Sequence, residues 1–149
     1  MKRAFPILID ICAALLVLLF LYTAIMKLSD YGNFLDQLQH SPQLNPYARL
    51  ISWLIPAAEI ATAILLIIPK TKRLGLLLAF LIMFIFSFYV FYVLSYAREI
   101  PCACGGVLSG MDWEQHLIFN LIYTGIALMG LLLSQNILLR KRSGKAENL

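Results

Sequence analysis

Charged residues are scarce in this chain, and their scarcity excludes an ordinary water-soluble domain. Only 13% of the 149 residues are Asp, Glu, Lys or Arg, whereas 61% are hydrophobic. Soluble domains carry roughly 25% charged residues and about 45–50% apolar residues. The composition therefore indicates a protein that is embedded in a lipid bilayer.

The first apolar run also lacks the features of a cleaved secretory signal peptide. Lys2 and Arg3 precede it, as they would in a signal peptide, but its apolar stretch is too long. Tyr22 stands where a cleavage site requires a small residue. We therefore expect this run to be retained as a membrane span.

Four long apolar runs account for most of the chain, and they cover residues 4–26, 50–68, 74–96 and 117–133. Each is near the roughly 20 residues that a helix needs to cross a ~30 Å hydrocarbon core. Backbone groups in lipid must bond within their own segment, so each run should be helical. The sequence predicts an all-α fold, a polytopic four-transmembrane-helix bundle that forms a single membrane domain over residues 1–149.

The distribution of basic residues predicts how the bundle is oriented. If the N-terminus is cytoplasmic, nine of the twelve Lys and Arg residues face the cytoplasm, and Lys27, Arg49 and Arg98 face outward. Cytoplasmic loops carry such an excess. We expect a bacterial inner-membrane protein with both termini and a basic tail, residues 140–149, in the cytoplasm. Because these residues cluster at helix ends rather than on a polar face, nucleic acid is not an expected partner.

The first outward segment carries a second helical pattern. Its apolar residues Tyr31, Phe34, Leu35 and Leu38 follow the spacing i, i+3, i+4, i+7. This spacing predicts a short amphipathic helix after the first span, lying on the membrane surface.

Cysteine is rare, yet two of the three cysteines lie one residue apart in the outward segment between the third and fourth runs. Cys102 and Cys104 have Cα atoms about 5.5–7 Å apart in extended or turn geometry, which overlaps the range for a disulfide. Strained, exposed disulfides are the labile and oxidising ones. Gly105 and Gly106 add backbone freedom and leave room for a partner chain. These features favour a redox-active pair.

Two other interpretations of the cysteine pair stay open. The first is a structural or incidental pair, in which a disulfide does no more than staple the loop. Two thiolates also suit a soft ion such as Cu(I), but no metal-type spacing unites them with Met111 or His116, and we predict no metal site. His116 is expected to be a polar residue at the membrane interface.

Glu59 lies in the middle of the second apolar run, three residues after Pro56. An ionisable side chain at that depth is costly and normally faces the bundle interior with a partner. Glu59 is either a proton-handling carboxyl or a neutral, hydrogen-bonded carboxyl that fixes helix packing. Asp10, nearer the end of its run, is expected to reach water or Lys2 and Arg3.

Three tyrosines lie on one face near the outer end of the third run. Tyr89, Tyr92 and Tyr96 have the spacing i, i+3, i+7. They predict either an aromatic belt at the membrane interface or a flat pocket for a quinone ring beside the cysteine loop. A quinone is therefore a candidate cofactor.

Several motifs resemble those of the DoxX-like membrane proteins and their MauE branch. Residues 23–30, TAIMKLSD, followed by Phe34, resemble the end of the first DoxX-like helix, and residues 56–59, PAAE, resemble the start of the second. The cysteine loop, residues 111–113 and Asn120 resemble the methylamine-utilisation protein MauE. The likeness extends over about residues 5–135.

This resemblance implies a four-helix integral membrane protein that matures a periplasmic, disulfide-rich dehydrogenase subunit by disulfide formation or transport. It implies that Cys102 and Cys104 are the redox centre and that Glu59 is the family's membrane carboxyl. A thioredoxin-like protein or a periplasmic substrate protein would be the partner. Thiol oxidases of the vitamin K epoxide reductase type are similar in layout, but they carry Cys-x-x-Cys. The rival function is a non-enzymatic assembly factor or subunit.

Overall fold

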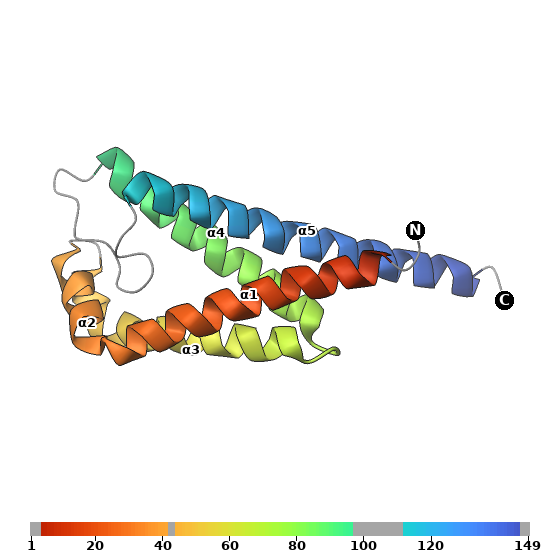
Figure 1. Ribbon diagram of the computed structural model, residues 1–149, viewed down its shortest axis with the longest axis horizontal. Helices are drawn as coiled ribbons and strands as arrows, with labels where there is room; N and C mark the ends of the chain where they lie inside the picture. Colours follow the sequence, from red (N-terminus) through yellow and green to blue (C-terminus); the bar gives the residue numbers. More distant parts are fainter. Residues whose placement is uncertain (1–3, 42–43, 97–111, 147–149) are drawn as a thin grey trace.

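The computed structural model describes residues 4–41, 44–96 and 112–146, and these ranges contain helices and no strand. The helices are α1 (Ala4–Ser29), α2 (Tyr31–His40), η1 (Asn45–Tyr47), α3 (Ala48–Ile67), α4 (Lys72–Tyr96) and α5 (Trp113–Ala146) (Figure 1). The predicted all-α fold is confirmed. The one large difference is that α5 continues past residue 133, because the following segment is rich in helix-forming Leu, Arg and Lys.

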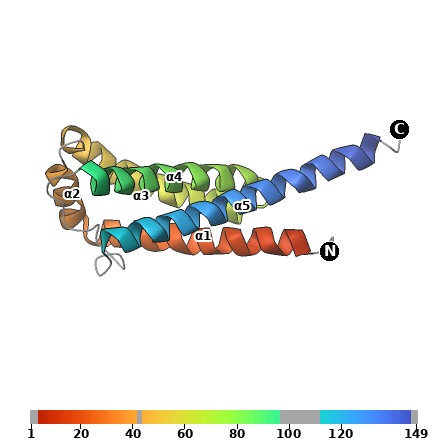
Figure 2. The ribbon, with the colours of Figure 1, turned by 90° about the horizontal axis from the view of Figure 1, so that it is seen from above.

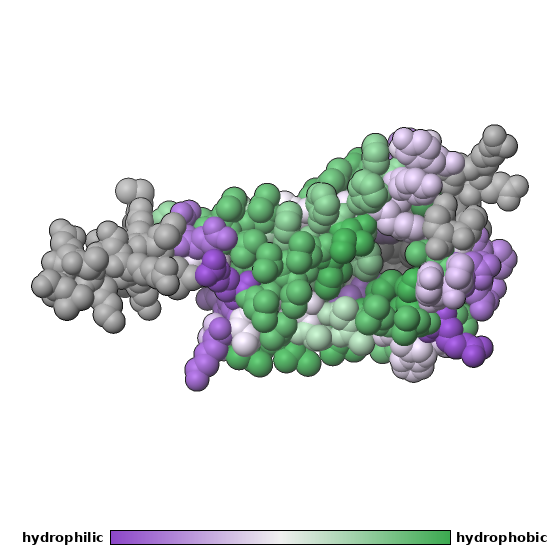
Figure 3. Space-filling view, turned by 180° about the vertical axis from the view of Figure 1, so that it is seen from behind, coloured by the Kyte–Doolittle hydropathy of each residue, from purple (hydrophilic) through white to green (hydrophobic). Residues whose placement is uncertain are grey.

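Four segments are long and apolar enough to cross a membrane: Phe5–Ser29, Asn45–Ile67, Lys72–Tyr96 and Glu114–Asn136. Their outward surfaces carry large apolar side chains, such as Leu18, Ile25, Ile85 and Phe88, that are exposed. Figure 3 shows an apolar band between two more polar ends. Such a band suits contact with lipid hydrocarbon rather than with water.

The four long helices run up and down, and each packs against two others. α1 and α4 each pack against α3 and α5, so that α1 and α4 lie diagonally across the bundle (Figures 1 and 2). The start of α1 and the end of α5 lie at one end. We call the other end, which holds α2, the starts of α3 and α5 and the ends of α1 and α4, the α2 end.

Large aliphatic and aromatic side chains fill the centre of the bundle, among them Leu16, Phe20, Leu66 and Leu76. Near the turn between α3 and α4, the two backbones come unusually close at Gly75. A Cβ atom added to Gly75 would lie 2.8 Å from the backbone nitrogen of Leu66. The missing side chain therefore permits the tight packing of these two helices.

The short helix α2 lies across one end of the bundle (Figure 1). Its buried residues Phe34 and Leu38 pack with Ala48 of α3. The predicted amphipathic helix is thus present, and its apolar side contacts α3 of the same chain. This contact makes α2 a cover over the α2 end.

Candidate functional site

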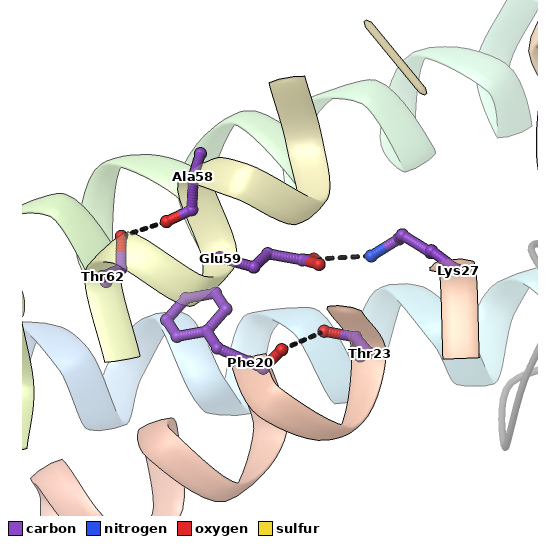
Figure 4. A network of polar contacts seen from close by, with 6 residues as sticks. All are labelled: Phe20, Thr23, Lys27, Ala58, Glu59 and Thr62. Atoms are coloured by element: carbon purple, nitrogen blue, oxygen red, sulfur yellow. Dashed lines mark hydrogen bonds and ion pairs between the residues drawn. The ribbon is translucent and has the colours of Figure 1, made fainter. Parts of the chain in front are cut away.

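A buried ion pair joins α1 to α3 near the α2 end. The Lys27 Nζ atom lies 2.5 Å from Glu59 Oε1, and the two side chains are 13% and 1% exposed. Figure 4 shows the lysine of α1 pointing at the carboxylate of α3. Glu59 faces the bundle interior with a partner, as predicted, and that partner is a cation.

Aromatic rings complete the surroundings of the Lys27 ammonium group. It lies 5.9 Å from the ring centroid of Phe34 in α2 and 5.6 Å from that of Phe86 in α4. Cations are attracted to the faces of aromatic rings at such distances. Lys27 therefore interacts with α2, α3 and α4 from its place at the end of α1.

The carboxylate of Glu59 is not fully satisfied by this lysine. Its second oxygen, Oε2, is buried and accepts no hydrogen bond from the part of the chain that the structure describes. The nearby Thr23 hydroxyl donates to the carbonyl of Phe20, at 3.2 Å (Figure 4). A buried acceptor without a donor is costly, so this oxygen is open to one further donor or to a proton.

Other polar side chains are also buried at the α2 end, among them His116 and Ser41. His116, in the first turn of α5, is 8% exposed. Its side chain therefore faces the bundle interior, and its interfacial depth in the membrane stays a prediction. The Tyr89 hydroxyl of α4 lies 3.1 Å from Ser41 Oγ, which follows α2.

The three tyrosines predicted on one face have different surroundings. Tyr92 and Tyr96 are exposed, and their ring centroids are 5.2 Å apart. Tyr89 is half-buried and directed toward Ser41. The structure thus pairs Tyr92 with Tyr96 at the surface and ties Tyr89 to the segment that covers the bundle end.

The predicted redox residues Cys102, Cys104, Gly105 and Gly106 lie outside the described residues, and so does the predicted disulfide. Their segment joins the end of α4 to the start of α5, and both of these lie at the α2 end (Figure 1). In the ranges that the structure describes, no group of three or more His, Cys, Asp or Glu side chains could hold a metal ion.

Sequence analysis missed Lys27 as the partner of Glu59 and counted it only as a loop charge. The signal was its spacing, because Phe20, Thr23 and Lys27 follow i, i+3, i+7 and share one face of α1. A second interhelical pair was also missed. Asp10 Oδ1 lies 2.6 Å from Lys72 Nζ in α4, and its side chain is 64% exposed. Lys2 and Arg3, the other expected partners of Asp10, lie outside the described residues.

Four membrane-length helices with a buried Lys–Glu pair between two of them define a multi-pass membrane protein with a charged interior site. Residues 5–133 match the family described as methylamine utilisation protein MauE, and the chain belongs to this family. No curated protein and no solved structure shows a significant match to the chain.

Proposed function

We propose that this protein performs thiol–disulfide exchange through Cys102 and Cys104 and thereby matures a periplasmic protein used in methylamine utilisation. Membership in the MauE family, whose description names methylamine utilisation, is the observation that carries the proposal. Two of the three cysteines lie one residue apart in the segment that joins α4 to α5. That arrangement suits a membrane scaffold that presents one reactive pair to a partner.

The proposed exchange begins with a thiolate of the partner attacking one sulfur of the Cys102–Cys104 disulfide. The S–S bond breaks, a mixed disulfide forms, and the other cysteine leaves as a thiolate. A second thiolate of the partner then attacks the mixed disulfide and releases both cysteines in reduced form. The partner, a periplasmic substrate protein or a thioredoxin-like protein, loses two electrons and two protons overall.

Continued turnover requires that the reduced pair be oxidised again. A membrane quinone is the proposed acceptor, because it takes up two electrons and two protons to become a quinol. The exposed Tyr92–Tyr96 pair at the end of α4 supports this proposal, since its adjacent rings form an aromatic surface at the α2 end. Tyr89, on the preceding turn, is proposed to hold α4 against the covering segment through Ser41.

The compartment of the reaction follows from the distribution of basic residues. We propose that both termini lie in the cytoplasm of a bacterium and that the α2 end faces the periplasm, because this orientation puts nine of twelve basic residues inside. Disulfides persist in the periplasm and are rare in the cytosol.

For Glu59 we propose a role in supporting the α2 end rather than in the exchange itself. Its contact with Lys27 joins α1 to α3, and the aromatic contacts of Lys27 extend to α2 and α4. These contacts hold the helices together at the α2 end. The segment that carries the cysteines connects the end of α4 to the start of α5 at this same end.

Single cysteine variants test the exchange. In Cys102→Ser or Cys104→Ser, the remaining thiolate should attack the disulfide of the oxidised partner and displace one partner thiolate. The resulting mixed disulfide should be visible on a non-reducing gel and lost on reduction. One variant should trap far more than the other, because attack and resolution are different roles. Cys12→Ser is the matched control, since Cys12 is buried in α1 and should leave trapping unchanged. Normal maturation of the periplasmic protein by the double Cys→Ser variant would instead support the assembly-factor role.

A further inference from the structure

The membrane-facing surface near the α2 end contains a shallow open groove. Pro46, Tyr47, Arg49, Leu50 and Trp53 line it. These residues come from η1 and the first turns of α3, on the outside of the bundle. None of them contributes to the Lys27–Glu59 pair, so the groove is separate from the buried site.

The Trp53 side chain forms one wall of the groove, and a contact with Tyr31 fixes its position. Trp53 is 59% exposed, yet its ring centroid lies 5.2 Å from that of Tyr31 in α2. The Tyr31 hydroxyl in turn lies 3.0 Å from Ser52 Oγ. Contacts on one side of the indole thus leave its other surface available for a ligand.

Arg49 gives this apolar groove a positive charge. Its side chain is exposed and takes part in none of the ion pairs formed within the described ranges. Guanidinium groups bind phosphate through two parallel hydrogen bonds. The positive end of the α3 helix dipole favours an anion at the same place.

The position of the groove along the bundle indicates which kind of ligand it binds. The membrane-length segment begins at Asn45, four residues before Arg49. A bilayer that matches this segment would have the border between headgroups and hydrocarbon near Arg49. Leu50 and Leu54, farther along α3, are both exposed on the apolar surface. A ligand that fits both parts has a phosphate head and a long apolar tail.

We propose that this groove binds one phospholipid, whose phosphate contacts Arg49 and whose acyl chain lies along Leu50, Trp53 and Leu54. Aromatic residues concentrate at the depth of the headgroups, where an amphipathic ring meets both environments. Bound in this way, the lipid would cover the start of α3 next to the cover helix α2. The inference is independent of the proposed thiol chemistry.

Trp53 fluorescence provides a direct test. The chain has two tryptophans, so Trp113→Phe leaves Trp53 as the reporter. The detergent-solubilised variant would be titrated with phosphatidylglycerol bearing brominated acyl chains, which quench nearby indoles. Saturable quenching is expected, and Arg49→Gln should weaken the apparent affinity about tenfold, as loss of a charge-assisted contact implies.

The control variant is Arg73→Gln. Arg73 is an exposed arginine in the first turn of α4, at the end of the bundle opposite to Arg49, so its loss should leave the affinity unchanged. Brominated diacylglycerol, which has the same tails and no phosphate, should quench only at much higher concentration. Equal quenching by the two lipids, or equal affinity with and without Arg49, would overturn the proposal. Native mass spectrometry of the otherwise unmodified chain gives a second readout. Arg49→Gln, but not Arg73→Gln, should lose a bound phospholipid.

Discussion

At the residue scale, the Lys27–Glu59 pair predicts a large cost for removing one partner only. Lys27→Met would leave Glu59 buried without its cation, and breaking a buried ion pair in this way costs about 3–5 kcal/mol. We expect the free energy of unfolding in mixed micelles to fall by that amount. Lys27→Met combined with Glu59→Leu should recover much of the loss, because two apolar residues leave no buried charge.

The pair between Asp10 and Lys72 is the matched control for this prediction. It also joins two helices through a lysine and a carboxylate, but its side chains are 64% and 24% exposed. Exposed ion pairs contribute about 0–1 kcal/mol, so Lys72→Met should change the unfolding free energy little. Equal losses for Lys27→Met and Lys72→Met would contradict the account of a charged interior site.

Sequence reasoning located the buried acid but not its partner, and the reason is geometric. The position of Glu59 in the middle of an apolar run predicts that its carboxyl faces inward, because an ionisable group facing lipid at that depth is costly. Its partner depends on which faces of α1 and α3 meet, and Lys27 lies 32 positions away in the sequence. The two segments that carry the DoxX-like resemblance, residues 23–30 and 56–59, contain the two partners.

At the scale of the elements, the close approach of α3 and α4 depends on Gly75. A Cβ atom added to Gly75 would lie 2.8 Å from Leu66 N and 3.0 Å from Leu65 C, and these backbone atoms of α3 cannot rotate away. Gly75→Ala should therefore force the helices apart and lower the unfolding free energy by about 1–3 kcal/mol. Thermal unfolding in detergent, followed by circular dichroism, would register the change as a lower Tm.

Gly125 in α5 provides the control, because a Cβ atom there would meet nothing within 4 Å. Gly125→Ala should stabilise the protein by about 0.5–1 kcal/mol, since alanine loses less conformational freedom in a helix than glycine does. A lower Tm for Gly125→Ala than for Gly75→Ala would show that helix packing is not the determining factor.

Apolar run length predicted all four long helices, because lipid leaves the backbone no alternative. The ends were harder to predict, and α5 extends to Ala146 because helix formation continues where hydrophobicity stops. The amphipathic spacing also predicted α2. The spacing did not show whether the apolar face of α2 contacts lipid or α3, because either surface can pack against that face.

At the scale of the whole molecule, the up-and-down arrangement brings the start of α1 and the end of α5 to one end (Figure 1). The excess of basic residues predicts that this end is cytoplasmic. A fluorescent protein that matures only in the cytoplasm should therefore fluoresce when fused after Lys145. An alkaline phosphatase, which is active only in the periplasm, should be inactive at the same position. Phosphatase activity there would reverse the orientation and put Cys102 and Cys104 in a reducing compartment.

The redox state of the cysteine pair in intact cells tests the central claim most directly. Cells would be quenched in acid, and free thiols would be alkylated with a reagent that adds a fixed mass per thiol. In the Cys12→Ser background, the account predicts that unreduced protein gains no mass on alkylation. Protein that is reduced first should gain two tags, one on Cys102 and one on Cys104. Overexpression of a periplasmic protein with reduced cysteines should shift part of the population to the tagged form. Two tags before any reduction, with or without that protein, would contradict thiol–disulfide exchange at Cys102 and Cys104.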